Sequence, residues 1–335
     1  MKRSRLITVI IISIIGIFLS ILISLAFGSR RIPLNEVIQI LATINDMGMN
    51  DLNRIVIMER IPRTIFALVA GGALGVSGAL MQSLTRNPIA DPSILGVNTG
   101  ASLAVVIGIA VFNIGTLNSY IWFSLIGAII TAFFVYSIGS LGVGGATPIK
   151  LALAGTVTSA ALSSIVGAIV LTRTAVMNQF RFWQVGSISG ATWEGLYTIT
   201  PFILVGLVLA FASSKSLDAL ALGEELATGL GARVGVIKII SAISGILLCG
   251  AVTALAGPIG FVGLMVPHTA RLLLGSSLKH MIPFSFIGGA IVLVCADVIG
   301  RLIGSPGELE AGIVTAFIGA PILIYIAMKA KVTAL

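Results

Sequence analysis

The sequence predicts an all-α membrane protein with ten transmembrane helices, organised as one polytopic domain over residues 1–335. Hydrophobic residues make up 57% of the 335 residues and charged residues only 10%, a composition more apolar than a soluble domain requires. Long apolar runs recur along the chain, and about 18 or more apolar residues suffice to cross a hydrocarbon layer as a helix. The short alternating segments of a membrane β-barrel are not seen, so helices are the expected spanning elements.

Ten apolar segments follow one another, and an even number of spans puts both termini on the same side of the membrane. The first segment follows Lys2, Arg3 and Arg5 and resembles a signal peptide. Its length of about 22 residues exceeds a typical signal-peptide core, so an uncleaved first span is expected. The ten segments are Leu6 to Phe27, Thr64 to Met81, Ile94 to Phe112, Ile121 to Leu141, Lys150 to Leu171, Leu196 to Phe211, Val236 to Ala256, Phe261 to Leu274, Phe284 to Ile299 and Gly312 to Met328.

The positive charges favour a cytoplasmic N-terminus. With that orientation, 12 Lys and Arg residues fall inside and 8 outside. Cytoplasmic loops carry such an excess of positive charge. The net charge of +8 is spread over loop ends without a single basic run, so it indicates membrane topology and no nucleic-acid partner. The inside set is Lys2, Arg3, Arg5, Arg86, Lys150, Lys215, Arg233, Lys238, Arg271, Lys279, Lys329 and Lys331, and the outside set is Arg30, Arg31, Arg54, Arg60, Arg63, Arg173, Arg181 and Arg301.

Three arginines at outer helix ends run against the positive-inside tendency, namely Arg60, Arg63 and Arg301. One interpretation is snorkelling or local pairing with Glu59 and Asp297. The other is an outward basic patch that docks an acidic partner, because the guanidinium fork suits carboxylates.

Small residues recur every four positions in several spans and predict close helix packing. The fifth segment carries Gly155, Ser159, Ser163 and Gly167, and the tenth carries Gly312, Ala316 and Ala320.

Two stretches look like broken helices. Asn87 to Gly96 and Gly257 to Arg271 each contain two prolines, which remove a backbone donor and disfavour helix before them. Both follow a long apolar segment, the second and the seventh. This placement favours two related halves of opposite topology.

Ser213 to Val234 is a polar interruption in an otherwise apolar chain, and the topology places it in the cytoplasm. Leu222, Leu226 and Leu230 recur at a spacing of four, with Glu224 and Glu225 near the helix start. The spacing predicts a short amphipathic helix, ended by Gly229 or Gly231. Its apolar stripe could pack on its own protein, on lipid headgroups, or in a groove on a partner.

Several chemistries lack their sequence signals. No phosphate-binding G-x-x-x-x-G-K-[ST] loop occurs, so ATP-driven work requires another chain. Cys249, Cys295, His268 and His280 show no metal-ligand spacing, and we expect no metal site, no bound cofactor and no catalytic residues. Intramembrane carboxylates for proton coupling are also lacking, which disfavours an ion-coupled secondary transporter without excluding sodium sites.

Five ordered stretches resemble the FecCD family of ABC-transporter permeases over essentially the whole length. The family imports ferric siderophores, haem and cobalamin. In the tenth-segment stretch many relatives have a proline where this chain has Glu310 and Ala311. The stretches are RIPRTIFALVAGGALGVSGALMQSLTRNPIADPSILGVNTGA (60–101), RFWQVGSISGATWE (181–194), ALGEELATGLGARV (221–234), GPIGFVGLMVPHTARLLLG (257–275) and ELEAGIVTAFIGAPILIYI (308–326).

The resemblance implies a type II ABC importer permease in the bacterial cytoplasmic membrane, built from two inverted five-helix halves. It implies a second permease subunit, identical or similar, two cytosolic ATPases that use ATP and Mg²⁺, and an extracytoplasmic substrate-binding lipoprotein. A ferric siderophore is the expected cargo, with cobalamin or haem as the alternative.

The resemblance also assigns roles to residues of this sequence. It implies binding-protein docking at Arg60, Arg63 and Arg301, ATPase coupling at Leu217, Leu222, Glu224, Leu226, Ala227, Leu230 and Gly231, and a pathway and subunit interface at Thr147, Pro148, Ile149, Gly155, Ser159, Ser163, Gly312 and Ala316.

Overall fold

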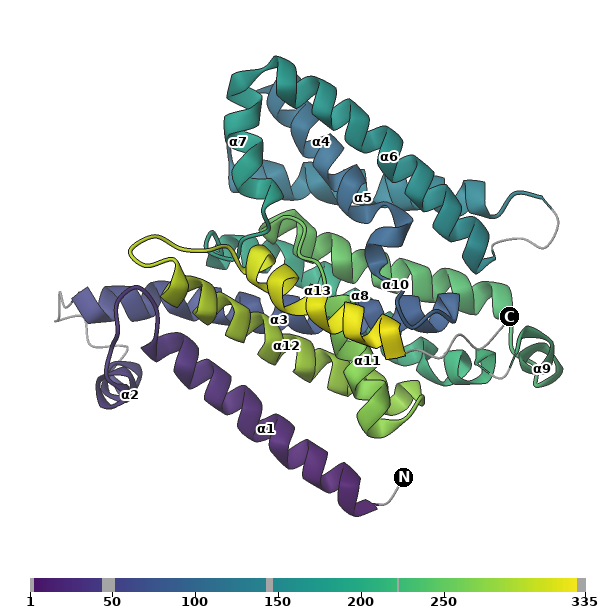
Figure 1. The fold of residues 1–335 in the computed structure, drawn as a ribbon, viewed down its shortest axis with the longest axis horizontal. Helices are drawn as coiled ribbons and strands as arrows, with labels where there is room; N and C mark the ends of the chain where they lie inside the picture. The colour runs from purple at the N-terminus through teal and green to yellow at the C-terminus, as the bar shows by residue number, and fades with distance from the viewer. Residues whose placement is uncertain (1–2, 44–51, 143–146, 222, 330–335) are drawn as a thin grey trace.

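The computed structural model describes residues 3–43, 52–142, 147–221 and 223–329, which form helices joined by turns and loops (Figure 1). Each of the ten predicted segments corresponds to one of ten main helices, although the predicted and observed ends differ. Seven of these helices are long and apolar enough to cross a membrane, and α4, α11 and α13 are shorter apolar helices. The ten are α1 (Arg3–Ala26), α3 (Leu52–Thr85), α4 (Val97–Phe112), α5 (Leu117–Gly139), α6 (Pro148–Thr172), α8 (Trp193–Leu220), α10 (Val234–Ala256), α11 (Val262–Leu274), α12 (Leu278–Ile303) and α13 (Ala311–Lys329).

Four short elements connect the long helices: α2 (Leu34–Ala42), the 3₁₀ turn η1 (Pro92–Leu95), α7 (Thr174–Gln184) and α9 (Glu224–Gly229). Figure 1 shows α2 at one end of the body and α9 at the other. In the same view α1 begins, and α13 ends, toward the α9 end. The two ends of the long helices are therefore called the α2 end and the α9 end.

Helix α3 starts 12 residues earlier than the second apolar segment predicts, at Leu52 instead of Thr64. Its 34 residues span about 51 Å at 1.5 Å per residue, which exceeds a hydrocarbon layer of about 30 Å. Arg and Glu are good helix formers, so the polar segment that carries Arg60 and Arg63 continues the helix and projects at the α2 end.

The helix contacts divide the fold into two related halves. In the first half α4 packs on α5 and α6, and in the second half α11 packs on α12 and α13. Helix α3 contacts α12, its counterpart α10 contacts α5, and α3 and α10 contact each other. Because each half contributes five long helices, the second half begins on the opposite side. The two predicted interruptions also correspond, since η1 precedes α4 and the loop Gly257 to Phe261 precedes α11.

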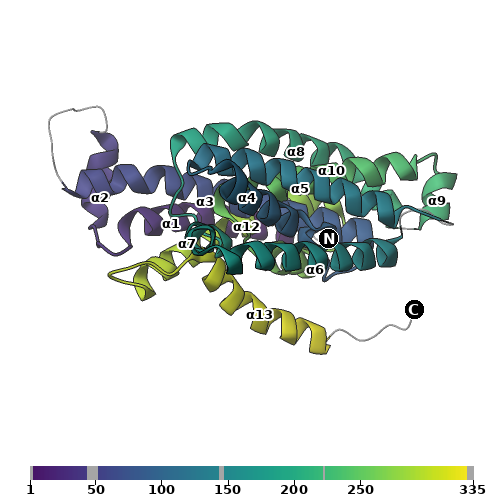
Figure 2. The ribbon, with the colours of Figure 1, turned by 90° about the horizontal axis from the view of Figure 1, so that it is seen from above.

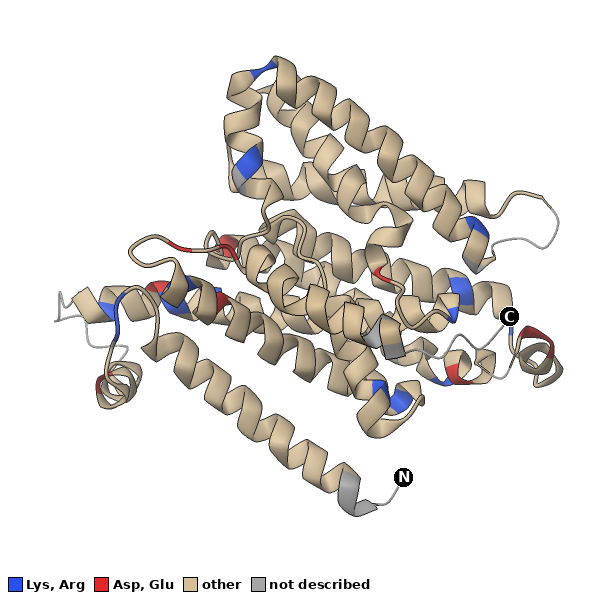
Figure 3. Cartoon of the chain, viewed as in Figure 1, with Lys and Arg blue, Asp and Glu red and all other residues tan. Residues whose placement is uncertain are grey.

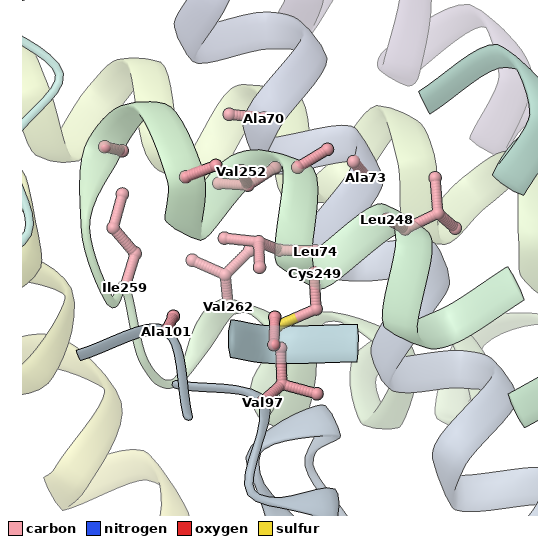
Figure 4. Close-up of a cluster of buried hydrophobic side chains, with 14 of the residues drawn as sticks. Ala70, Ala73, Leu74, Val97, Ala101, Leu248, Cys249, Val252, Ile259 and Val262 are labelled. Atoms are coloured by element: carbon pink, nitrogen blue, oxygen red, sulfur yellow. The ribbon is translucent and has the colours of Figure 1, made fainter. Parts of the chain in front are cut away.

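Small residues allow the backbones of α3 and α12 to approach closely. A Cβ on Gly71 would overlap the carbonyl oxygen of Gly289, and a Cβ on Gly75 would overlap that of Ser285. The core beside this contact is shown in Figure 4, where Leu74 of α3, Val97 of α4, Val252 of α10 and Val262 of α11 lie together. The α3–α12 pair thus forms a closely packed unit along the centre of the protein.

Most of the outer surface of the long helices is apolar. Helix α1 exposes a majority of its large apolar side chains, and α5, α6 and α13 each expose isoleucine, leucine or phenylalanine. Figure 3 shows charged residues concentrated toward the two ends of the helices, with few between them. This distribution is that of a membrane-embedded body, with polar residues at both water-facing ends.

The α3–α12 contact predicts the effect of a single methyl group. Gly71→Ala should lower the free energy of unfolding by about 1–3 kcal/mol, because the backbones must separate to admit the new atom. Gly235→Ala is the matched control, since Gly235 opens onto free space in α10 and the exchange should be neutral or stabilising by up to about 1 kcal/mol. Thermal unfolding of the purified protein in detergent measures both, and equal stability of the two variants would contradict the close α3–α12 packing.

Candidate functional site

A cavity of about 580 Å³ opens at the α2 end and brings six charged residues together. It is formed by the loop after α1, the first half of α3, the segment before α8, the end of α12 and the loop before α13. Four of its lining residues are arginines and two are glutamates. The lining residues are Ser29, Arg30, Val56, Met58, Glu59, Arg60, Pro62, Arg63, Ser189, Ala191, Thr192, Trp193, Arg301 and Glu308.

Two of the cavity arginines close the C-terminal end of α1. Arg60 Nη1 donates to the carbonyl oxygen of Leu25 at 2.7 Å, and Arg301 Nη1 donates to that of Ser24 at 3.1 Å. Backbone donors reach the neighbouring carbonyls, from Phe27 to Ile23 and from Ile32 to Ala26. The last four carbonyls of α1 are therefore all satisfied, and the positive charges suit the negative end of the helix dipole.

Asp297 connects Arg63 and Arg301. Its Oδ1 lies 2.6 Å from Arg63 Nη2, and its Oδ2 lies 2.9 Å from Arg301 Nη2. Arg63 Nε adds a bond to Oδ1 at 3.0 Å. The carboxylate is only 2% exposed. One buried negative charge thus joins α12 to α3 through Arg63 and also binds Arg301 within α12.

Glu308 supplies the outermost contact of this cluster. Its Oε2 accepts a hydrogen bond from Arg63 Nη1 at 2.8 Å, and its side chain is 32% exposed. Glu308 lies in the loop between α12 and α13. Arg63 therefore has one side bound to a buried carboxylate and the other bound to a half-exposed one.

These contacts bear on the two interpretations of the arginines. Local pairing is observed for Asp297, which binds Arg63 and Arg301, whereas Glu59 is exposed. Arg60 and Arg301 are almost fully buried, at 6% and 2% exposure. Arg63, whose Nη1 is held by Glu308, is the most accessible of the three. Docking of a partner at this cluster remains a prediction, with Arg63 as its most accessible point.

At the α9 end, the polar stretch differs from its sequence interpretation. Helix α8 runs on through Ser213 and Ser214 to Leu220, because both hydroxyls bond carbonyls of the preceding turn at Ala210 and Phe211 and so need no water. Leu217 is therefore buried in α8 and does not belong to a separate amphipathic helix.

The separate helix α9 is only six residues long. Ala227 is its buried anchor, while Leu226 and Leu230 are 62% and 70% exposed. Glu224 Oε1 lies 2.7 Å from Lys238 Nζ, which ties α9 to α10. The chain leaves this region through Gly231 at a φ of +83°. Leu222 lies outside the described residues.

The predicted pathway and interface residues lie on α6 and α13. Thr147 caps α6, Pro148 opens the helix, and Ile149 is exposed. Gly155 packs against the carbonyl of Ile94 inside the chain, and the hydroxyls of Ser159 and Thr99 lie 3.1 Å apart.

The remaining positions are divided between the interior and the surface. Gly312 donates from its backbone to Gly186, and Ala316 is half-buried. Ser163 is exposed on α6, and Phe317 is exposed on α13. The two glycines thus serve packing within the chain, while exposed apolar side chains of α6 and α13 are available for contact with another surface.

Known proteins resemble this chain over nearly its whole length. A model of the FecCD transport family matches residues 14–329. The ferric enterobactin transport system permease protein FepD of Escherichia coli (strain K12) is 39% identical over 322 residues, 95% of each chain. The probable siderophore transport system permease protein YfiZ of Bacillus subtilis (strain 168) is 38% identical over 323 residues, 96% of each.

A more distant relative and a solved structure agree with these matches. The hemin transport system permease protein HmuU of Yersinia pestis is 32% identical, over 95% of this chain and 96% of its own. A solved structure described as an inward-facing metal-chelate type ABC transporter superposes with a TM-score of 0.79 at 25% identity, covering 95% of this chain and 97% of that chain.

The buried carboxylate at the α2 end yields a stability prediction. Asp297→Ala should lower the free energy of unfolding by about 3–5 kcal/mol, because it leaves the buried Arg301 without a counter-charge and leaves Arg63 paired with Glu308 alone. Glu59→Ala removes an exposed carboxylate from the same cavity and should change it by no more than about 0.5 kcal/mol. Thermal unfolding in detergent compares the two, and similar losses would show that Asp297 does not hold α3 and α12 together.

Proposed function

The chain belongs to the FecCD transport family and is a permease subunit of a binding-protein-dependent ABC importer, and we propose that its cargo is a ferric siderophore. The cargo proposal is supported by relatives named for siderophore, enterobactin and Fe³⁺-citrate transport at 38–42% identity. Haem is the second candidate, supported by the hemin permease at 32% identity, and cobalamin is the third. An ion-coupled secondary transporter is a remote alternative.

The proposed assembly contains two permease subunits, two cytosolic ATPases and one extracytoplasmic binding protein. The exposed apolar faces of α6 and α13 support a subunit interface, because they lie on one side of the body, away from α8 and α10 (Figure 2). The second subunit is either an identical or a similar chain. The remaining apolar faces contact lipid.

The proposed orientation places the α9 end in the cytosol and the α2 end outside, with both termini cytoplasmic. The excess of Lys and Arg predicted on the inside supports this direction. The start of α1 and the end of α13 both lie toward the α9 end, in keeping with termini on one side. The 580 Å³ cavity then faces the binding protein, and the exposed Leu226 and Leu230 face the ATPase.

In this arrangement the permease forms the path and carries out no bond chemistry. ATP binding and hydrolysis in the partner ATPase shift the permease between outward-open and inward-open states, because nucleotide and binding protein have different affinities for the two states. Arg63 offers Nη1 to an acidic side chain of the binding protein. Arg60 and Arg301 keep the cavity positively charged while they close α1.

The cavity contacts predict opposite effects for two substitutions. Arg63→Gln should weaken binding-protein affinity about tenfold or more, since it removes a charge-assisted contact. Glu308→Gln should strengthen binding, because Glu308 competes for Arg63 Nη1 in the free permease. Both effects should shrink as salt is raised.

The matched control is Glu310→Gln, which removes the same charge from the same loop at a residue without a contact to Arg63. Surface plasmon resonance of the binding protein on the reconstituted complex measures all three variants. Unchanged affinity for Arg63→Gln would remove this cluster as the docking site.

The transport class and cargo are tested with the complete complex in lipid vesicles. We expect ATP-dependent uptake of a ferric siderophore, and stimulation of ATP hydrolysis by that chelate only when the binding protein is present. Uptake driven by an ion gradient without ATP would instead identify a secondary transporter. Stimulation by haem or cobalamin, with no response to ferric siderophores, would replace the proposed cargo.

A further inference from the structure

The N-terminus of α12 is capped by a carboxylate from another helix. Leu278 N donates to Asp218 Oδ1 at 2.7 Å, and Ser277 Oγ donates to Asp218 Oδ2 at 3.0 Å. Asp218 lies in the last turn of α8, about 60 residues away in sequence. Ser277 occupies the N-cap position but makes no side-chain cap of its own, although serine is among the best residues for that task. The Asp218 carboxylate therefore caps α12 and at the same time joins α12 to α8.

The same turn of α8 is also held by α3. Arg86, the residue directly after α3, donates from Nη2 to the carbonyl oxygen of Leu220 at 2.9 Å. Leu220 is the last residue of α8, so its carbonyl has no partner within the helix. The end of α8 is thus bonded to the α9-end termini of two other helices, α12 through Asp218 and α3 through Arg86.

These two helices carry the charged cluster at the α2 end. Arg60 and Arg63 lie on α3, and Asp297 and Arg301 lie on α12. Between the ends, α3 and α12 meet through glycines that admit no extra atom. A closely packed pair of this kind moves as a unit more readily than it deforms.

Helix α9 follows α8 after a connection of three residues and packs against α8 and α10. Its tie to α10 is the pair Glu224 and Lys238, whose glutamate is half-exposed. An exposed pair of this kind contributes little. Helix α9 is continuous in the chain with the end of α8, and that end is bonded to α12 and α3 through the backbone groups of Leu278 and Leu220.

We propose that Asp218, assisted by Arg86, is a positioning residue that transmits displacement of α9 to the α3–α12 pair and hence to the outer cavity. This inference rests on the proposed function, in which α9 contacts the ATPase and the cavity receives the binding protein. Asp218 holds the end of α8 against the start of α12, so a shift of α9 moves α12 with it. Asp218 therefore connects the two partner sites, and its proposed role involves no direct binding of cargo or nucleotide.

The test uses the full complex of permease, ATPase and binding protein in lipid vesicles. Asp218→Ala should lower the stimulation of ATP hydrolysis by the loaded binding protein at least about fivefold, the lower limit of typical coupling between two sites. Uptake should fall in parallel. Basal hydrolysis, co-purification of the ATPase and affinity for the binding protein should all stay at wild-type values.

Two further variants separate coupling from stability. Asp218→Asn keeps an acceptor oxygen for Leu278 N and should restore most of the stimulation, because the hydroxyl of Ser277 can accept from the new amide. Lys215→Ala removes an exposed charge one turn earlier on α8 and should leave stimulation unchanged. Arg86→Ala should lower stimulation by itself, and more when combined with Asp218→Ala.

Two results would overturn the proposal. Wild-type stimulation in Asp218→Ala would show that the cap transmits nothing. Loss of ATPase co-purification together with basal hydrolysis would show that Asp218 only maintains the α9 surface, an effect that Leu226→Asp should reproduce. Failure of the proposed function has a different signature, since the wild-type complex would then show no ATP-dependent uptake.

Discussion

Helix ends in this protein are closed by charged side chains that come from distant parts of the chain. Arg60 and Arg301 reach carbonyls at the end of α1 from 35 and 277 residues away, Asp218 caps α12, and Arg86 bonds the last carbonyl of α8. Backbone groups near a membrane need a protein partner wherever water is scarce. The helices are thereby fixed to one another at the points where they leave the apolar layer.

This constraint explains why Arg60, Asp297 and Arg301 are buried. Asp297 on α12 pairs with Arg63 of α3 and with Arg301, which bonds the end of α1. One carboxylate therefore supports three helices. The cluster has little freedom to rearrange, because loss of Asp297 leaves the buried Arg301 without a counter-charge. Glu308 is partly exposed, so its separation from Arg63 costs less free energy than separation of the buried pairs. The same residues can therefore maintain the fold and present a positive surface.

The ten spans and the two halves could be predicted from the sequence, because apolar length and proline position record them directly. The three arginines could be singled out by their position, and Asp297 could be named as a local partner. The α1 carbonyls that Arg60 and Arg301 bind could not be predicted, since backbone carbonyls leave no trace in sequence. Ser213 and Ser214 misled the prediction of the polar stretch, because their hydroxyls are satisfied within α8. Asp218 and Glu308 carry no local signal, as their contacts lie about 60 and 245 residues away.

The size of α9 has a consequence for how such importers diversify. Under the proposed ATPase contact, the six-residue helix offers the exposed Leu226, the next residue Leu230 is also exposed, and one buried alanine anchors them. Substitutions at those two leucines alter the outward face without touching the packed interior. Selection for a new ATPase partner and selection for a stable membrane core then act on separate residues, so a permease lineage can exchange its motor subunit through few and nearly independent mutations.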